Sequence, residues 1–211
     1  MVKGVIFDLD GVICFTDKYH YLAWKKLADR LGIYFDEQIN NRLRGVSRMD
    51  SLNIILEKSN VEYTQEQKES FAKEKNDEYV KLLKNLSAKD VDNDTRKTLH
   101  KLKEMGIKIA VGSSSKNTPL ILKQIELDTL FDFVADGNCI THSKPHPEVF
   151  LKAAAGINLE PKDCLVVEDA ISGIDAGLNG GFRTIAIGDA RKHPHTTYKI
   201  NEIKDILDIV A

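Results

Sequence analysis

Four acidic residues follow two short apolar runs, and their types and spacing could support metal-assisted chemistry. Asp8 and Asp10 come directly after residues 5–7, and Glu168 and Asp169 come after residues 164–167. Residues two apart in an extended chain point the same way, so the Asp8 and Asp10 carboxylates would repel each other unless a cation neutralised them. An all-oxygen, carboxylate-rich set favours a hard cation, and Mg2+ is the usual choice where phosphate is handled.

Two further segments carry groups that could hold phosphate. Residues 113–117 read Ser-Ser-Ser-Lys-Asn after a third apolar run, and Lys144 stands just before a helical pattern. Serine hydroxyls, an ammonium group and the free N–H groups of a helix that begins after Ser115 all suit phosphate oxygens. Each pattern alone is more often a turn or a helix cap. Their joint occurrence, each near the end of an expected strand, favours one active site.

The elements that must position these groups alternate between strands and helices. We expect strands at 2–8, 107–111, 131–135, 164–167 and 184–187, and helices at 94–105, 117–127, 147–156, 172–180 and 201–210. Ligands of open parallel sheets bind beyond the carboxyl ends of the strands. The polar groups described above would therefore converge at one edge of the sheet.

Residues 16–87 show helical patterns and no convincing strand. Apolar residues recur at helical spacing from Tyr21 to Leu31, and Thr64 with Gln67 forms a capping box for a long charged helix. We predict an α/β fold with a doubly wound parallel-sheet, Rossmann-like core. Residues 1–15 and 88–211 would form this core, and residues 16–87 would form an inserted all-helical cap.

The composition is that of an ordinary globular protein and argues against several classes of partner. The 211 residues are 42% hydrophobic and 29% charged, and the net charge is -2. We therefore expect no nucleic-acid or membrane surface, and a small molecule as partner. The three cysteines lack metal spacing, which fits reduced, mostly buried thiols in a cytosolic protein. We expect no signal peptide or transmembrane helix, a cytoplasmic location and a monomer.

The acidic, serine and lysine motifs together resemble those of the haloacid-dehalogenase-like superfamily. They occur in the superfamily's order, as Asp8-Leu9-Asp10-Gly11-Val12, Ser113, Lys144-Pro145 and Glu168-Asp169, and the resemblance covers essentially the whole chain. It implies that Asp8 attacks phosphorus to form an aspartyl phosphate and that Asp10 is the general acid and base. It also implies that Ser113 and Lys144 bind the transferring phosphoryl group. One Mg2+ would be held by Asp8, the Asp10 carbonyl, Glu168 and Asp169.

The cap segment is similar to that of the hexose-phosphate mutases of this superfamily. The residues that carry this resemblance are Thr16, His20, Trp24, Gly45, Arg48, Ser51 and Lys75 in the cap, with Ser113, Ser114, Ser115, Lys116 and Asn117 in the core. It implies interconversion of β-glucose 1-phosphate and glucose 6-phosphate, with glucose 1,6-bisphosphate as intermediate and activator. Arg48 would bind the distal phosphate near residues 115–117, and His20 and Lys75 would link cap closure to Asp10.

Other interpretations remain open at this point. A sugar-phosphate or phosphoglycolate-type phosphatase would use the same core with water as the acceptor, and a non-catalytic binding module could keep the fold. Arg48 alone could be a surface arginine, His20 a packing residue, and Trp24 is expected in the cap core. Two departures from the family pattern are Cys14-Phe15 and the stretch 189–198. Cys14 is expected to be a small buried side chain.

Four further histidines form suggestive pairs. His193 and His195 flank a proline in a polar stretch, which suggests a metal clip, but a third ligand is absent from the local sequence. We expect a solvated loop there. His142 and His146 stand on either side of Lys144, and we expect them to be loop residues rather than ligands.

Overall fold

A six-stranded parallel sheet forms the centre of the larger part of the protein. The computed structural model describes residues 2–211. The strands are β1 (Gly4–Phe7), β2 (Lys108–Gly112), β3 (Phe133–Ala135), β4 (Cys164–Glu168), β5 (Arg183–Ala186) and β6 (Tyr198–Lys199). Their order is β3-β2-β1-β4-β5-β6, and all neighbours pair in parallel. The chain therefore runs from the central strand outward in both directions, as expected for a doubly wound fold.

Alternate side chains of the central strands enter two separate apolar layers. Val5 and Phe7 of β1 pack in the layer that contains α5 (Asn93–Glu104), α6 (Thr118–Gln124) and α9 (Ile206–Val210). Ile6 points into the other layer, with α7 (Glu148–Gly156) and α8 (Ile171–Asn179). Burial of each such side chain contributes roughly 1.5–3 kcal/mol. The apolar run of β1 is continuous because both of its faces are covered by helices.

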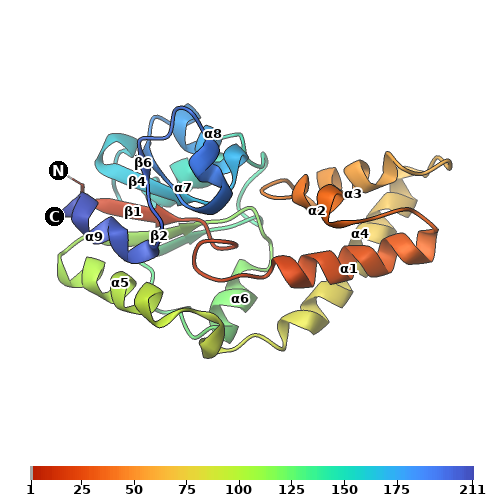
Figure 1. Ribbon diagram of the computed structural model, residues 1–211, viewed down its shortest axis with the longest axis horizontal. Coiled ribbons are helices and arrows are strands. Elements are labelled where there is room, and N and C mark those ends of the chain that lie inside the picture. Colours follow the sequence, from red (N-terminus) through yellow and green to blue (C-terminus); the bar gives the residue numbers. More distant parts are fainter. Residues whose placement is uncertain (1) are drawn as a thin grey trace.

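Four helices inserted between β1 and α5 form a second body with its own apolar centre. They are α1 (Asp17–Leu31), α2 (Glu37–Asn41), α3 (Arg48–Leu56) and α4 (Gln65–Leu83), and they lie to one side of the sheet in Figure 1. Trp24 of α1 and Leu52 of α3 are buried in one cluster. The capping box of Thr64 and Gln67 at the start of α4 is confirmed.

The C-terminal segment differs from the expected helix at 201–210. The structure has a 3-10 turn at Ile203–Asp205, followed by the short helix α9. Strand β6 precedes it and was missed by the sequence analysis. It consists of two residues, both of which pair with β5. Just before it, the side chains of Thr196 and Thr197 form hydrogen bonds with Thr184. So short and polar a strand has no apolar pattern to reveal it.

One expectation for the exposure of a side chain was wrong. His193 is buried rather than solvated, because its Nε2 lies 3.0 Å from the Asp175 carboxylate of α8. The thiols are mostly buried, as expected, since Cys14 and Cys164 are buried and Cys139 is exposed. Within residues 2–211, no helix is both long enough and apolar enough to span a membrane.

Candidate active site

A buried ion-pair cluster lies at the carboxyl ends of β1 and β4. The Lys144 ammonium is 2.5 Å from Asp8 Oδ1 and 2.5 Å from Glu168 Oε1. All three residues are buried. Strands β1 and β4 are direct neighbours in the sheet, which brings Asp8 and Glu168 to the same edge. Burial alone would lower the pKa of Lys144, but the charges of the two carboxylates raise it, so the amine stays protonated.

Negative charge exceeds positive charge in this cluster. The ligand atoms of Asp8, Glu168 and Asp169 all lie within 4.8 Å of one another. Burial raises the pKa of Glu168 to about 7, and burial together with the Glu168 charge raises the pKa of Asp169 to about 8. One ammonium cannot neutralise three carboxylates. The donor set therefore fits a hard divalent cation, which prefers oxygen ligands.

Glycine 11 allows the chain after Asp8 to pass close to this cluster. Its φ is 87°, a left-handed conformation that favours glycine, and a Cβ atom there would collide with the Asp169 carboxylate. Asp10, just before this glycine, contacts Thr16 and His20 at the start of the helical insertion. The Asp-Gly pair is thus a steric requirement of the site as well as a turn signal.

Asp10 is connected to the cap by a chain of hydroxyl groups. Thr16 Oγ1 donates to the Asp10 carboxylate, and Tyr79 Oη donates to Thr16 Oγ1 at 2.9 Å. Burial raises the pKa of Asp10 to about 6, and the nearby charge of Asp8 acts in the same direction. A carboxyl group that titrates near neutrality suits general acid–base chemistry.

His20 and Lys75 form a second connection between Asp10 and the cap. His20 Nε2 is 3.9 Å from Asp10 Oδ2, and His20 Nδ1 is 2.8 Å from Lys75 Nζ. The Lys75 ammonium also lies over the rings of Trp24 and Tyr79. Burial, with the neighbouring Lys75 charge, lowers the pKa of His20, so the ring is a neutral hydrogen-bonding group here.

Tyr79 was missed by the sequence analysis, although a signal for it exists. It is fully buried, its ring stacks on His20 at 4.0 Å, and its hydroxyl supports Thr16. Tyr79 stands four residues after Lys75, on the same face of α4. A tyrosine at that spacing from a predicted site lysine indicates a shared face.

The loop after β2 contacts both the core and the cap. Ser113 is buried, and its Oγ accepts a hydrogen bond from the Ser115 backbone N–H at 3.2 Å. The Asn117 side chain donates to Asn76 Oδ1 of α4 at 2.9 Å. Ser114 Oγ is buried without a hydrogen-bond partner in the described chain, and Lys116 is exposed.

The loop before α3 lies against the core near the start of α8. Gly45 has a φ of 75°, and a Cβ atom there would collide with Ser172 at the start of α8. Arg44 pairs with Asp17 at 3.0 Å and with Asp189 of the core at 3.6 Å. The sequence analysis missed three residues of this contact, because none of them belongs to a recognisable motif: Arg44, Ser172 and Asp189.

Arg48 and Ser51 lie further along the same segment, in α3. Ser51 is buried and Arg48 is half-buried. Burial lowers the pKa of Arg48, and burial together with the Arg48 charge lowers the pKa of Lys75. In the part of the chain that the structure describes, no hydrogen bond or ion pair joins these two side chains to the Asp8 cluster.

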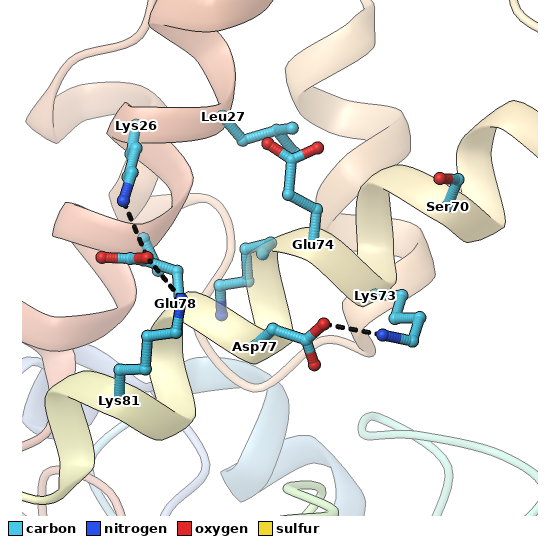
Figure 2. A pocket seen from close by; sticks show the side chains of 10 residues that line it. Lys26, Leu27, Ser70, Lys73, Glu74, Asp77, Glu78 and Lys81 are labelled. Carbon is cyan, nitrogen blue, oxygen red and sulfur yellow. Dashed lines mark hydrogen bonds and ion pairs between the residues drawn. The ribbon is translucent and has the colours of Figure 1, made fainter.

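A groove of about 400 Å3 between α1 and α4 is a different feature from this site. Figure 2 shows two ion pairs among its lining side chains, Lys26 with Glu78 at 2.8 Å and Lys73 with Asp77 at 2.7 Å. None of the acidic residues of the Asp8 cluster lines it, and Lys75 is the lining residue that also belongs to the connection with Asp10.

Comparison with known families identifies the class of protein that this fold and site define. The family model described as haloacid dehalogenase-like hydrolase matches residues 2–181. The chain belongs to this family. The predicted α/β fold with a helical insertion is thereby confirmed.

Particular relatives are similar over almost the whole chain. A β-phosphoglucomutase of Bacillus subtilis is 39% identical over 192 residues, which are 90% of this chain and 85% of that protein. A crystal structure of β-phosphoglucomutase from Clostridium difficile has a TM-score of 0.94 and 37% identity, covering 100% of this chain and 96% of that one. A phosphorylated carbohydrates phosphatase of Thermotoga maritima is 27% identical and covers 87% of this chain and 84% of that protein.

Replacement of Tyr79 by phenylalanine tests the hydroxyl chain. We expect Tyr79→Phe to lower the free energy of unfolding by about 1–2 kcal/mol, because the buried Thr16 hydroxyl loses a partner. Urea unfolding measures this change. Tyr34→Phe is the matched control, since the Tyr34 hydroxyl donates to Asp36 from an exposed side chain. Equal effects of the two substitutions would contradict a supporting role for Tyr79.

Proposed function

We propose that the protein is a phosphomutase that interconverts β-glucose 1-phosphate and glucose 6-phosphate through a phosphorylated Asp8. The β-phosphoglucomutases of Bacillus subtilis and Clostridium difficile support this proposal at 39% and 37% identity. We further propose Mg2+ as the metal, glucose 1,6-bisphosphate as intermediate and activator, and a cytoplasmic monomer. We also propose a core of residues 1–15 and 88–211 and a cap of residues 16–87.

The observation that carries the proposal is a pair of basic cap side chains without carboxylate partners. Lys75 is buried and Arg48 is half-buried, and neither forms an ion pair within residues 2–211. Burial, together with the nearby Arg48 charge, lowers the pKa of Lys75. A positive charge on an unpaired basic side chain in such surroundings is costly unless an anion binds there. A bisphosphate intermediate needs a cationic site away from the metal, and the planar guanidinium of Arg48 suits a phosphate group.

The two aspartates divide the chemistry between them. An Asp8 oxygen attacks one phosphorus of glucose 1,6-bisphosphate, the bond from that phosphorus to the sugar oxygen breaks, and the proton held by Asp10 passes to that oxygen. In the other half-reaction the free C6 hydroxyl of β-glucose 1-phosphate attacks the phosphorus of the aspartyl phosphate, the bond from phosphorus to Asp8 breaks, and the hydroxyl proton passes to Asp10. A pKa of about 6 allows Asp10 to act in both directions near neutral pH.

The remaining residues of the cluster bind and orient. Asp8, Glu168, Asp169 and the Asp10 carbonyl would hold Mg2+, which neutralises charge on the phosphoryl oxygens. Lys144 would contact the same phosphoryl group from the side of Asp8 and Glu168, where it already lies. The Ser113 hydroxyl and the Ser114 N–H group would bind its remaining oxygens.

Contacts between cap and core would exclude water during transfer. Asn76 with Asn117 and Arg44 with Asp189 join the two bodies on different elements. Hydrolysis of an aspartyl phosphate by water would turn a mutase into a phosphatase. The ratio of isomerisation to phosphate release is therefore the quantity that separates the two functions.

The first experiment measures both products together. The protein is incubated with Mg2+, β-glucose 1-phosphate and a trace of glucose 1,6-bisphosphate, and glucose 6-phosphate and free phosphate are followed. We expect fast formation of glucose 6-phosphate with little phosphate. Asp8→Asn should abolish turnover, and Asp10→Asn should slow it by roughly 100-fold or more. Phosphate release without isomerisation would replace the proposal with a sugar-phosphate phosphatase, and full activity of Asp8→Asn would exclude the covalent route.

Arg48 provides a sharper test of the distal phosphate site. We expect Arg48→Ala to lower kcat/KM for isomerisation by about 100-fold, because a charge-assisted bidentate contact contributes roughly 1.5–3 kcal/mol. Arg42→Ala is the matched control, since Arg42 lies six residues earlier and pairs with Glu57 at the surface. A normal rate in Arg48→Ala, or an equal loss in Arg42→Ala, would remove Arg48 from that role.

The acidic cluster makes metal binding depend on pH. The raised pKa values of Glu168 and Asp169 mean that the folded, metal-free protein retains protons that the unfolded chain releases. The contribution of these two groups to the free energy of unfolding therefore falls as pH rises through about 4 to 8. Mg2+ competes with these protons, so the rise in Tm on adding Mg2+ should be small at pH 5 and larger at pH 8. Thermal unfolding at fixed free Mg2+ checks this, and an equal rise at both pH values would count against the assigned ligands.

A further inference from the structure

A second cluster of metal-binding side chains lies on the surface, on the loop that carries Lys144. Ligand atoms of His142, His146 and Glu148 lie within 4.8 Å of one another. Both histidines are exposed, and the Glu148 side chain is 16% exposed. The Lys144 side chain is buried, whereas the histidines before and after it reach the surface. The cluster shares no residue with the acidic site.

Glu148 is held in place before any ion binds. It is the first residue of α7, and its Oε2 accepts backbone hydrogen bonds from Thr141 at 3.0 Å and His142 at 2.9 Å. Lys152 lies 2.8 Å from Oε1. The Lys152 contact and these backbone groups lower the pKa of Glu148 to about 2. The carboxylate is therefore ionised and fixed beside both imidazole rings.

The two imidazoles are close to this carboxylate and to each other. His142 Nδ1 is 3.4 Å from Glu148 Oε2, and the ring centroids of His142 and His146 are 4.6 Å apart. The Glu148 backbone N–H donates to His146 Nδ1 at 3.3 Å, so that nitrogen presents a lone pair rather than a proton. A metal ion at His146 Nδ1 would replace this long hydrogen bond from the Glu148 N–H.

We propose that His142, His146 and Glu148 form a binding site for a borderline-soft transition-metal ion, with Zn2+ as the best match. Two imidazole nitrogens and one carboxylate oxygen suit Zn2+ better than Mg2+, which prefers oxygen ligands. Water would complete the tetrahedral coordination. Zn–N bonds of about 2.1 Å place neighbouring ligand atoms roughly 3.4 Å apart, so ligand atoms that now lie within 4.8 Å of one another must approach by up to about 1.4 Å. The exposed histidine side chains are free to make this movement.

The site has a consequence for the loop, which does not depend on the proposed function. An ion bound by His142 and His146 would join the residues on both sides of Lys144 to the first turn of α7. The Lys152 ammonium opposes binding, because it already neutralises the Glu148 carboxylate. These opposing effects predict a site of moderate affinity that responds to the concentration of free metal.

Histidine NMR resonances during a Zn2+ titration test the site directly. Mg2+ is present in excess to occupy the acidic cluster, which has no histidine ligand. We expect one equivalent of Zn2+ to shift the His142 and His146 imidazole resonances and to leave those of His100 and His195 in place. Calorimetry should show affinity reduced by more than about tenfold in His142→Ala and in Glu148→Gln, since loss of a supporting group alone costs that much.

His100→Ala is the matched control, because His100 is an exposed histidine on α5. It should bind Zn2+ as the unmodified protein does. Unchanged His142 and His146 resonances at a tenfold excess of Zn2+ would overturn the proposal. So would equal affinities of His142→Ala and His100→Ala. Retained Tm values in the variants establish that any loss of binding is local.

Discussion

The Lys144 ammonium, held between Asp8 and Glu168, is the interaction on which the site depends. Two buried carboxylates at the ends of neighbouring strands would repel each other without it, and the cost of an uncompensated buried charge is several kcal/mol. The ammonium reaches them from the loop before α7, so strands β1 and β4 and this loop are tied at one point. The site also depends on the parallel sheet, because parallel pairing brings the carboxyl ends of β1 and β4 to the same edge.

The distribution of charge between the two bodies of the protein follows from this arrangement. The core holds more carboxylates than cations, with Asp169 added to the pair that Lys144 bridges. The cap presents Lys75 and Arg48 without carboxylate partners in the described chain. Asp10, Thr16 and Tyr79 connect the two regions through hydroxyl hydrogen bonds rather than ion pairs. A sugar with phosphate at both ends fits a metal-binding acidic site in the core and basic side chains in the cap, and this fit is the basis of the proposed mutase function.

Much of the fold and the position of the acidic groups could be predicted from the sequence, because strand ends and polar residues coincide in it. The rule that ligands bind at the carboxyl ends of parallel strands was enough to place Asp8, Glu168 and the loop before α7 at one edge of the sheet. The spacing of Tyr79 from Lys75 indicates a shared helix face, but nothing in the sequence shows that the Tyr79 hydroxyl bonds to Thr16. Arg44 and Asp189 are far apart in sequence and meet only in the folded chain. His193 was misjudged because its partner Asp175 lies on another element.

The two buried lysines have opposite pKa shifts, and this has a consequence for proton exchange with the solvent. The Lys144 pKa is raised by the Asp8 and Glu168 charges, whereas burial and the Arg48 charge lower that of Lys75. An anion that binds beside Lys75 would raise its pKa again, and the protein would take up protons from the buffer. A cation that binds beside Glu168 and Asp169 would release them. The heat of binding would therefore vary with buffer ionisation in opposite directions for the two ligands.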